Sequence, residues 1–303
     1  MPAPRAAVDV GSNSVRVLVH GAAGERITRV MEVTRLGTGV DRRGRLDDVA
    51  LDRTLATIGR YHDLWRHHGV TDRVRIAATS AVRDASDRDR FFDGVRRRTG
   101  VDAEVLSGDE EARLAYLGAT GAVDVPLPAV VLDIGGGSTE LIVGGTAGAS
   151  MQLGCVRLTE RHLAADPPAA GELDAARSDV ARRLDEADAV LAQQGARVAD
   201  AASLVAVAGT ATTLAALYLG LDDYEEDAIH GTRLPAAALG ALTAELAAMP
   251  ASARARLGPM QPGREDVIHG GALVLDAVVA RYGFAEVVVS EADLLDGLVA
   301  SLA

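Results

Sequence analysis

Apolar stretches that stop at an acidic residue and resume after a small polar turn are the most regular feature of this chain. Residues 130–143 read Val-Val-Leu-Asp-Ile-Gly-Gly-Gly-Ser-Thr-Glu-Leu-Ile-Val, so an apolar run ends near Asp133 and a second run follows Glu140. The pattern predicts a strand, a tight turn and a second strand. Glycine tolerates positive φ and lets a ligand approach the backbone closely. A glycine-rich hairpin without a ligand is the alternative, although it would need fewer glycines and no flanking acids.

Residues 6–19 repeat this pattern. They align with 130–143 without a gap and match at four positions: Asp9 with Asp133, Gly11 with Gly135, Ser14 with Ser138 and Val19 with Val143. Three more pairs of segments follow in the same order: 25–37 with 148–154, 74–79 with 205–210, and 103–107 with 285–290. The first of these pairs ends in Leu36-Gly37 and Leu153-Gly154. We therefore predict two structurally similar domains.

Amphipathic segments between the predicted strands indicate helices. They cover residues 47–68, 87–98 and 172–195, with further helices within 214–282. Three meandering strands followed by helix-connected strands predict an α/β fold, with a mixed five-stranded sheet flanked by helices in each domain. Pro126 and Pro128 place the boundary near residue 122, which gives domains of residues 1–122 and 123–303. A cleft between the domains is the expected place for an active site.

Composition narrows the class of protein. The 303 residues are 48% hydrophobic but only 3% aromatic, so we expect a core of Ala, Val and Leu. No apolar run reaches the length of a membrane span. The start, Met-Pro-Ala-Pro-Arg, does not resemble a signal peptide. The single cysteine, Cys155, cannot form an internal disulfide. We expect a cytoplasmic protein without a membrane partner.

The charges limit the chemistry of any anion site. The net charge of −12 argues against non-specific binding of nucleic acid. All 31 basic residues are arginine, because the chain contains no lysine. A site for an anion must therefore use guanidinium groups or backbone amides. A phosphate substrate would need arginines that concentrate locally against the acidic background.

The two predicted hairpin turns carry groups that suit phosphate and a cation. Amides and hydroxyls of small residues bind phosphate oxygens, and carboxylates beside the turn hold a cation or its water shell. The candidates are Asp9, Gly11, Ser12, Asn13 and Ser14 in the first turn, and Asp133, Gly135, Gly136, Gly137, Ser138 and Glu140 in the second. An Asx-type turn, in which Asp9 only caps local backbone, is the alternative for the first.

Two junctions between a strand and a helix are further candidate anion sites. Gly209 and Thr210 follow a strand and open a helix, where amides and the positive helix end attract anions. An ordinary threonine cap is the alternative. Residues 79–83 are the equivalent in the first half and add Arg83, which could instead be a surface arginine. Arg264 is expected near the Gly209 site, and no role is assigned to it or to Arg42, Arg43 and Arg45.

Glu111 is the candidate general base. Ser107 and Glu110 have the spacing of a capping box, and Asp109 favours the helix dipole. Glu111 is then left without a structural role, since the position that could hold an i,i+4 partner is Ala115. A glutamate of this kind can accept a proton from water, and an exposed surface glutamate is the alternative. The seven histidines show no spacing typical of metal ligands.

The chain combines five short motifs, at Asp9–Ser14, Ala78–Arg83, Ser107–Arg113, Asp133–Glu140 and Gly209–Thr213. This combination, which spans both halves, resembles the exopolyphosphatase/guanosine pentaphosphate phosphohydrolase family. The resemblance implies duplicated actin-like (ribonuclease H-like) domains, in agreement with the repeat. It also implies a phosphoric anhydride hydrolase that releases the terminal phosphate of inorganic polyphosphate or guanosine pentaphosphate. The family uses Mg²⁺ or Mn²⁺ and commonly forms homodimers.

The resemblance also implies roles for the candidate residues. Glu111 would activate the attacking water. Asp133 and Glu140 would hold the metal, and Asp9 would line the same site. The turn from Gly135 to Ser138 would bind phosphates together with Arg83.

Two departures from the family pattern concern the substrate. Longer members look like this chain plus additional C-terminal helical domains, and residues 290–297 differ from the usual Gly-Leu-Arg-Glu-Gly pattern. The chain looks like the short form seen among actinobacteria, so we expect short polyphosphates. Three alternatives stay open: a guanosine pentaphosphate 5'-phosphohydrolase, an ATPase or kinase of the actin superfold, and a non-catalytic sensor that binds polyphosphate or an alarmone.

Overall fold

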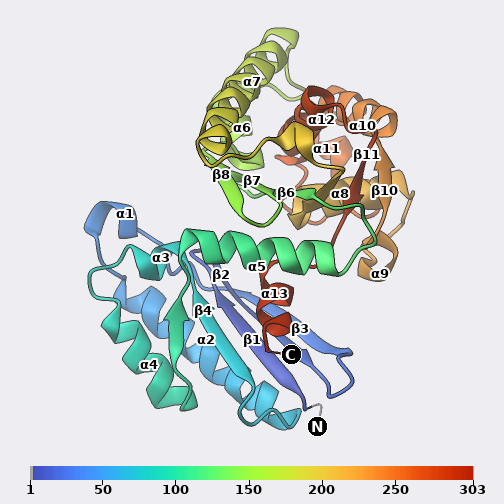
Figure 1. Ribbon diagram of the computed structural model, residues 1–303. Helices are drawn as coiled ribbons and strands as arrows, with labels where there is room; N and C mark the ends of the chain where they lie inside the picture. The colour runs from blue at the N-terminus through green and yellow to red at the C-terminus, as the bar shows by residue number, and fades with distance from the viewer. Residues whose placement is uncertain (1–2, 303) are drawn as a thin grey trace. The chain divides into compact units, whose positions relative to one another are not determined.

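The computed structural model describes residues 3–302, apart from the side chains of Asp41, Arg42 and Ser80. Arg42, to which the sequence assigns no role, thus has a side chain outside the described part. The chain divides into two compact units. One consists of Met1–Gly118 together with Leu294–Ala303, and the other of Ala119–Asp293. Each unit contains one sheet with helices packed on it (Figure 1).

The first unit contains a five-stranded mixed sheet in the order β3-β2-β1-β4-β5. β1 pairs antiparallel with β2 and parallel with β4, so the meander and the helix-connected strands share one sheet as predicted. Its elements are β1 (Arg5–Val10), β2 (Ser14–His20), β3 (Arg26–Val33), α1 (Val40–Arg43), α2 (Asp48–His67), β4 (Val74–Ala78), α3 (Ser80–Arg83), α4 (Asp89–Thr99), β5 (Ala103–Val105), α5 (Gly108–Gly121) and α13 (Leu294–Ala300).

Helices cover both faces of this sheet. Successive residues of a strand point to opposite faces, and Ala7 and Val8 accordingly belong to different hydrophobic clusters. Val8 lies in the cluster that contains Leu55 of α2 and Phe91 of α4, whereas Ala7 lies in the cluster of α5 and α13. Figure 1 shows α2 and α4 on one side of the strands and α13 on the other.

Helix α13 belongs to the first unit although the second unit precedes it in sequence. Leu295 and Leu298 are fully buried in the cluster with Ala7, and Asp296 forms an ion pair with Arg29 of β3 at 2.9 Å. Gly297 lies directly on α5, because a Cβ there would be 1.9 Å from the carbonyl oxygen of Leu114. The observed units therefore differ from the predicted domains, 1–122 and 123–303, mainly in these residues. The apolar pattern of a helix does not say which sheet it covers.

The second unit contains a six-stranded sheet in the order β10-β11-β9-β6-β7-β8. Its elements are β6 (Ala129–Ile134), β7 (Thr139–Val143), β8 (Ala147–Met151), α6 (Cys155–His162), α7 (Ala170–Gln193), the 3₁₀ helix η1 (Val198–Asp200), β9 (Ser203–Val207), α8 (Ala208–Tyr218), α9 (Glu226–Ile229), β10 (Arg233–Pro235), α10 (Ala236–Ala248), α11 (Ala251–Arg254), α12 (Ile268–Tyr282) and β11 (Glu286–Val289).

The predicted repeat is visible in the strand order. The order β8-β7-β6-β9-β11 in the second sheet corresponds to β3-β2-β1-β4-β5 in the first, with the same antiparallel and parallel pairs around the central strand. The prediction of a five-stranded sheet is one strand short for the second unit. The additional strand, β10, is only three residues long and ends in Pro235, so it has no readable alternation.

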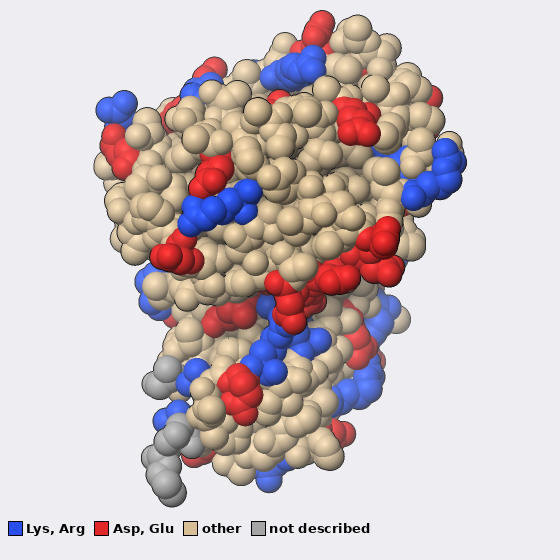
Figure 2. Space-filling model, turned by 90° about the vertical axis from the view of Figure 1, so that its right-hand side faces the viewer, with Lys and Arg blue, Asp and Glu red and all other residues tan. Residues whose placement is uncertain are grey.

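The residue types in the core and on the surface agree with the amino-acid composition. The buried members of the main cluster of the second unit, within the described residues, are Ala, Val, Leu, Ile and Met. On the face shown in Figure 2, arginines and carboxylates form small groups, several of them side by side, with uncharged surface between them. No helix within residues 3–302 combines the length and the hydropathy that crossing a membrane requires.

Candidate active site

The two predicted hairpin turns have the same backbone geometry. The amide of Gly11 donates to the carbonyl oxygen of Ser14 at 2.9 Å, and the amide of Gly135 donates to that of Ser138 at 3.0 Å. Each turn follows the central strand of its sheet, β1 or β6, and leads into the antiparallel neighbour. The aligned residues of the repeat are therefore structurally equivalent within their own units.

The matched pair Gly37 and Gly154 closes each turn from the side. The amide of Gly37 donates to the carbonyl oxygen of Ser12 at 2.7 Å, and a Cβ on Gly37 would lie 2.8 Å from Ser12 Cβ. A Cβ on Gly154 would lie 2.4 Å from the carbonyl oxygen of Gly136. These two glycines are needed because backbone approaches backbone too closely for a side chain.

The glycines of the turns themselves provide room, and not an unusual backbone conformation. None of Gly11, Gly135, Gly136 and Gly137 is among the positive-φ glycines of the described chain, so the expectation that they supply positive φ is wrong. A Cβ on Gly136 would lie 3.3 Å from Val156, and a Cβ on Gly137 would lie 3.3 Å from the guanidinium of Arg157. The absence of side chains leaves the turn backbone accessible.

The amides of the second turn are available to an anion. The carbonyl oxygens of Gly135 and Gly136 accept hydrogen bonds from the amides of Cys155, Val156 and Arg157 at 3.0 to 3.1 Å. The amides of Gly136 and Gly137, by contrast, make no hydrogen bond within residues 3–302, and both glycines are exposed. Adjacent unpaired amides on an exposed turn bind phosphate oxygens well.

The acidic residues beside the two turns differ in their partners. Asp9 lies opposite Arg16 in the β1–β2 ladder and accepts two hydrogen bonds from its guanidinium, at 2.6 and 3.0 Å. At the equivalent positions of the second unit, Asp133 lies opposite Glu140. Like charges at directly opposed positions destabilise a sheet. The first hairpin thus pairs an acid with a base, whereas the second places two acids at the corresponding positions, an arrangement that suits a cation.

The oxygen donors of the second hairpin suit a hard divalent cation. Ser150 donates to Glu140 at 2.8 Å, and burial raises the pKa of the Glu140 carboxyl, although the hydroxyls of Ser138 and Ser150 act in the opposite direction. Within residues 3–302, no group of three or more His, Cys, Asp and Glu side chains forms a closed metal site. Two carboxylates without a closed cage suit a hard ion that takes its other ligands from water and substrate phosphate.

Glu111 and Arg83 come together in the first unit. Arg83 donates from one Nη to Glu111 Oε2 at 3.3 Å and to the carbonyl oxygen of Leu106 at 3.1 Å. Both side chains are about one-third exposed, at 35% and 34%. The structure thus gives the candidate base a cationic neighbour that was predicted separately as a phosphate ligand. A guanidinium at the base can hold a phosphate beside the water that attacks it.

The neighbouring Glu110 has a structural role, as predicted, but partly through a different contact. Its amide donates to the Ser107 hydroxyl at 3.2 Å, which is one half of the capping box. Its carboxylate accepts from Arg75 at 2.7 Å, and this ion pair replaces the second half. The sequence pattern could not show this, because Arg75 comes from strand β4.

The start of α8 is an uncapped helix N-terminus. No side chain caps it, so the alternative of a threonine cap is wrong. Ala208 has φ of 66°, a left-handed conformation that is rare outside glycine. The guanidinium of Arg264 occupies the space beside Gly209, since a Cβ there would be 1.6 Å from its Nη1. The expected proximity of Arg264 to this site is confirmed.

The two candidate phosphate sites of the second unit adjoin each other. β6 and β9 are parallel neighbours with Asp133 opposite Val207, so the turn and α8 begin at the same sheet edge. Cys155 bridges them, because its amide donates to Gly135 at 3.0 Å and its thiol contacts the Thr210 hydroxyl. In the first unit, the amide of Thr79 donates to Val10 at 3.2 Å and places the start of α3 beside the first turn.

The predicted residues thus form one set in each unit. Asp9, Ser12, Asn13, Ser14, Arg83 and Glu111 belong to the first, and Asp133, Gly135, Gly136, Gly137, Ser138, Glu140, Gly209 and Thr210 to the second. Arg157, whose guanidinium lies against Gly137, was missed. No spacing in the sequence marks it, because its proximity to the turn arises from the corner between β8 and α6.

Comparisons with known proteins show the family and the fold of the chain. Residues 17–303 match the model of the Ppx/GppA phosphatase family. The chain is 41% identical to Exopolyphosphatase 2 of Mycobacterium tuberculosis (strain CDC 1551 / Oshkosh) over 318 aligned residues, which cover 98% of each chain.

Solved structures give the same result. A crystal structure of an exopolyphosphatase-like protein is 36% identical with a TM-score of 0.78 and covers 98% of each chain. The type II variant of the Aquifex aeolicus Ppx/GppA phosphatase is 26% identical with a TM-score of 0.87 and covers 99% of each. These matches confirm the resemblance found in the sequence and the duplicated actin-like fold. The chain belongs to the Ppx/GppA phosphatase family.

Proposed function

We propose that this protein is an exopolyphosphatase that hydrolyses the terminal phosphoanhydride bond of inorganic polyphosphate. One observation carries the proposal: the turn with the unpaired amides of Gly136 and Gly137 lies between the facing carboxylates Asp133 and Glu140 in a chain of the Ppx/GppA phosphatase family. Amides suit phosphate oxygens, and the carboxylates suit the cation that accompanies them. The name of the mycobacterial relative supports the activity.

Phosphate binding is assigned to backbone and hydroxyl groups first. The Gly135–Ser138 turn holds oxygens of the terminal phosphate, and the uncapped start of α8 at Gly209 and Thr210 receives an adjoining phosphate. Ser12, Asn13 and Ser14 of the first turn, with Arg83, complete the set of phosphate ligands. An arginine is the only basic side chain that this composition offers for the purpose.

A divalent ion, Mg²⁺ or Mn²⁺, would be held by Asp133 and Glu140. When bound, it offsets the negative charge of the phosphate oxygens. The charge of Asp9, in the first unit, is balanced by Arg16, so the binding of the ion is assigned to the second hairpin.

Glu111 acts as general base in this proposal. Its carboxylate orients a water molecule and takes a proton from it while the water oxygen forms a bond to the terminal phosphorus. The anhydride bond to the next phosphate breaks, and the products are inorganic phosphate and a chain shorter by one phosphate. Arg83 restrains Glu111 and stabilises the charge that develops on the phosphoryl oxygens.

A panel of phosphate-release assays tests the function. Tripolyphosphate, long polyphosphate, guanosine pentaphosphate and ATP are compared with Mg²⁺ and with Mn²⁺. We expect the highest kcat/KM with polyphosphate, and with short chains in preference to long ones. Preference for guanosine pentaphosphate would favour the second activity of the family, ATP preference would favour an ATPase, and binding without release would favour a sensor.

Asp133→Asn tests the metal site. The substitution removes one of two carboxylate ligands, so we expect the Mg²⁺ concentration for half-maximal activity to rise about tenfold. Asp174→Asn, at an exposed residue of α7 whose side chain is 78% exposed, is the matched control. An unchanged Mg²⁺ titration for Asp133→Asn would contradict the assignment.

The resemblance to the family also supports two proposals that do not depend on the site. We propose that the protein is a homodimer and that it acts in the cytoplasm. Sedimentation at equilibrium tests the first, and fractionation of the source cells tests the second. A monomer across the concentration range of the assay would contradict the homodimer.

A further inference from the structure

Helix α6 carries a guanidinium directly to the second turn. Arg157 lies in its first turn, and the nearest guanidinium nitrogen is 3.3 Å from the position that a Cβ on Gly137 would take. Within the described residues, its side chain contacts no carboxylate and donates only to the side-chain oxygen of Gln152. Its positive charge is therefore not neutralised by the protein, although the chain as a whole is strongly acidic.

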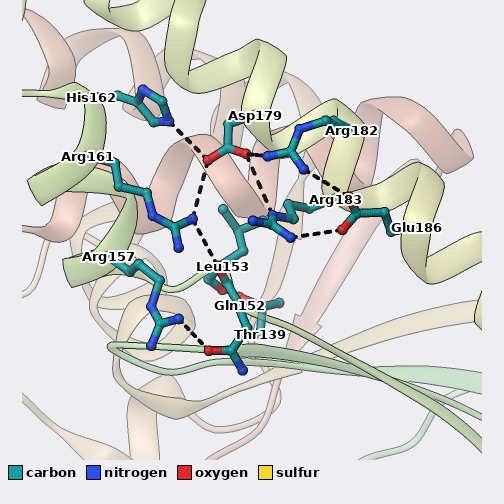
Figure 3. Close-up of polar contacts among 10 residues, drawn as sticks. All are labelled: Thr139, Gln152, Leu153, Arg157, Arg161, His162, Asp179, Arg182, Arg183 and Glu186. Atoms are coloured by element: carbon teal, nitrogen blue, oxygen red, sulfur yellow. Dashed lines mark hydrogen bonds and ion pairs between the residues drawn. The ribbon is translucent and has the colours of Figure 1, made fainter.

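Arg161 continues the basic surface one helical turn further along. It donates to the backbone oxygen of Gln152 at 3.1 Å, so the same residue positions both arginines. Residues four apart lie on one face of a helix, about 6 Å from each other along its axis. Figure 3 shows Arg157 and Arg161 projecting from α6 on the side of Gln152. Helix α6 contains only one acid, Glu160.

The acid nearest to Arg161 is shared among several cations. Asp179 of α7 is 7% exposed and lies 3.5 Å from Arg161, 3.7 Å from Arg183 and 3.0 Å from His162, and it also pairs with Arg182 (Figure 3). Burial acts in the opposite direction, but the hydrogen bond from His162 and the charge of Arg182 lower the pKa of Asp179, so it stays ionised. Arg182 and Arg183 also pair with Glu186, whereas Arg161 has no second carboxylate partner within the described residues. Since Arg161 shares its one carboxylate, its charge is only partly offset.

We propose that Arg157 and Arg161 bind the phosphates that follow the terminal one in a polyphosphate chain. This inference rests on the proposed function, because it starts from a phosphate in the Gly135–Ser138 turn. Arg157 is within reach of that turn and of the next phosphate, and Arg161 of phosphates further along. Two guanidiniums spaced along a helix recognise a linear polyanion of repeating charge, whereas a compact anion could contact only one of them.

We call Arg157 and Arg161 the α6 path. The dependence of polyphosphate binding on chain length tests it. Arg161→Ala and Arg157→Ala are compared with Arg177→Ala, an exposed arginine of α7 whose one ion pair among the described residues is with Asp174. We expect Arg161→Ala to raise KM about ten- to a hundredfold for long polyphosphate, the range for one charge-assisted hydrogen bond, and much less for tripolyphosphate. Arg157→Ala should raise KM for both substrates. Arg177→Ala should change neither value.

The outcomes separate this path from the function itself. Equal effects of Arg161→Ala on tripolyphosphate and long chains, or no effect on either, would overturn the path while wild-type turnover still supports the exopolyphosphatase. Titration of the Glu111→Gln variant with tripolyphosphate and long polyphosphate measures affinity without turnover. Suppose that the wild-type protein released no phosphate. If Glu111→Gln then bound long polyphosphate more tightly than tripolyphosphate, and the double variant with Arg161→Ala did not, the path would still be supported. Binding of an acidic peptide in place of long polyphosphate would overturn it.

Discussion

Glu111 shows how a single residue acquires a role from its neighbours. The carboxylate of the adjacent Glu110 forms an ion pair with Arg75, and its amide donates to the hydroxyl of Ser107. The side chain of Glu111 instead contacts Arg83 and is about one-third exposed. Two consecutive glutamates on one helix thus have different environments. The difference follows from the residues of other elements that reach them, Arg75 of β4 and Arg83 of α3, and not from the helix itself.

Glu111→Gln should lower kcat for polyphosphate by about 10²- to 10⁴-fold, the range for loss of a general base. The amide cannot accept the proton but has nearly the same shape, so the affinity for polyphosphate should stay close to that of wild type. Glu110→Gln is the matched control and should retain kcat, with a small loss of stability from the Arg75 contact. Comparable turnover by Glu111→Gln and wild type would refute the role of the base.

His269 leads to a second prediction for a single residue, which concerns how the stability of the fold depends on pH. It is 2% exposed, and burial together with the charge of Arg254 lowers its pKa to about 4, although Asp166 acts in the opposite direction. Asp266 also lines the same small cavity. The unfolded chain binds a proton near pH 6.5 and the folded chain does not, so stability is full above pH 6.5 and falls toward pH 4.

Urea unfolding at pH 7 and pH 5 checks this. Protonation of the unfolded state at His269 should remove about 2 kcal/mol at pH 5, since each unit of pH below 6.5 costs about 1.4 kcal/mol. His269→Gln has no proton to bind, so its loss between the two pH values should be smaller than that of wild type by this amount. The same loss in both proteins would show that His269 does not titrate on unfolding.

At the scale of elements, the two hairpins show which local features could be predicted from the sequence. Strand, turn and strand follow from short-range alternation and from the small residues of the turn, and the aligned copies proved equivalent. The reason for the glycines was not predictable in the same way. Positive φ is a local property, but the need for room at Gly154 arises from the packing of two backbones that are 18 residues apart in sequence. Contacts such as Arg75 with Glu110 were hidden for the same reason.

Gly154→Ala should damage the turn that we assign to phosphate. Its Cβ would lie 2.4 Å from a backbone oxygen of Gly136, so the turn must shift. We expect a loss of about 1–3 kcal/mol in the free energy of unfolding, as for overpacking, together with a raised KM for tripolyphosphate. Gly171→Ala, where the added Cβ meets open space in α7, is the control and should neither lower the free energy of unfolding nor raise KM. Wild-type values for Gly154→Ala would show that the turn tolerates displacement.

At the scale of the molecule, the sequence predicted two similar domains but not how the chain is shared between them. The repeat, the fold class and the family could be predicted because motifs and strand patterns recur in both halves. The assignment of α13 could not, since an apolar helix fits either sheet. The predicted roles of the site residues stay predictions, because catalysis depends on groups that a sequence pattern does not position.

Gly297→Ala tests the attachment of α13. An added Cβ would lie 1.9 Å from the carbonyl oxygen of Leu114, and backbone cannot yield as a side chain does. Because α13 must move away from α5, we expect the free energy of unfolding to fall by about 2–3 kcal/mol and the melting temperature to fall with it. Gly121→Ala places a Cβ in open space at the end of α5 and should melt as wild type does. Identical melting of both variants would mean that α13 can move away at no cost.

Because α13 lies at the end of the chain, the first unit is completed last during translation. A ribosome makes Arg5–Val105, with all five strands of the first sheet, long before it makes Leu294–Ala300. Leu18 and Ala77 on one face of that sheet share a cluster with α5 and α13, and α13 is made only after the whole second unit has been translated. The nascent first unit therefore exposes an apolar surface for most of its synthesis, at the stage when chains are most prone to aggregate and to bind chaperones. A gene fragment that encodes only residues 1–118 would make this exposure permanent.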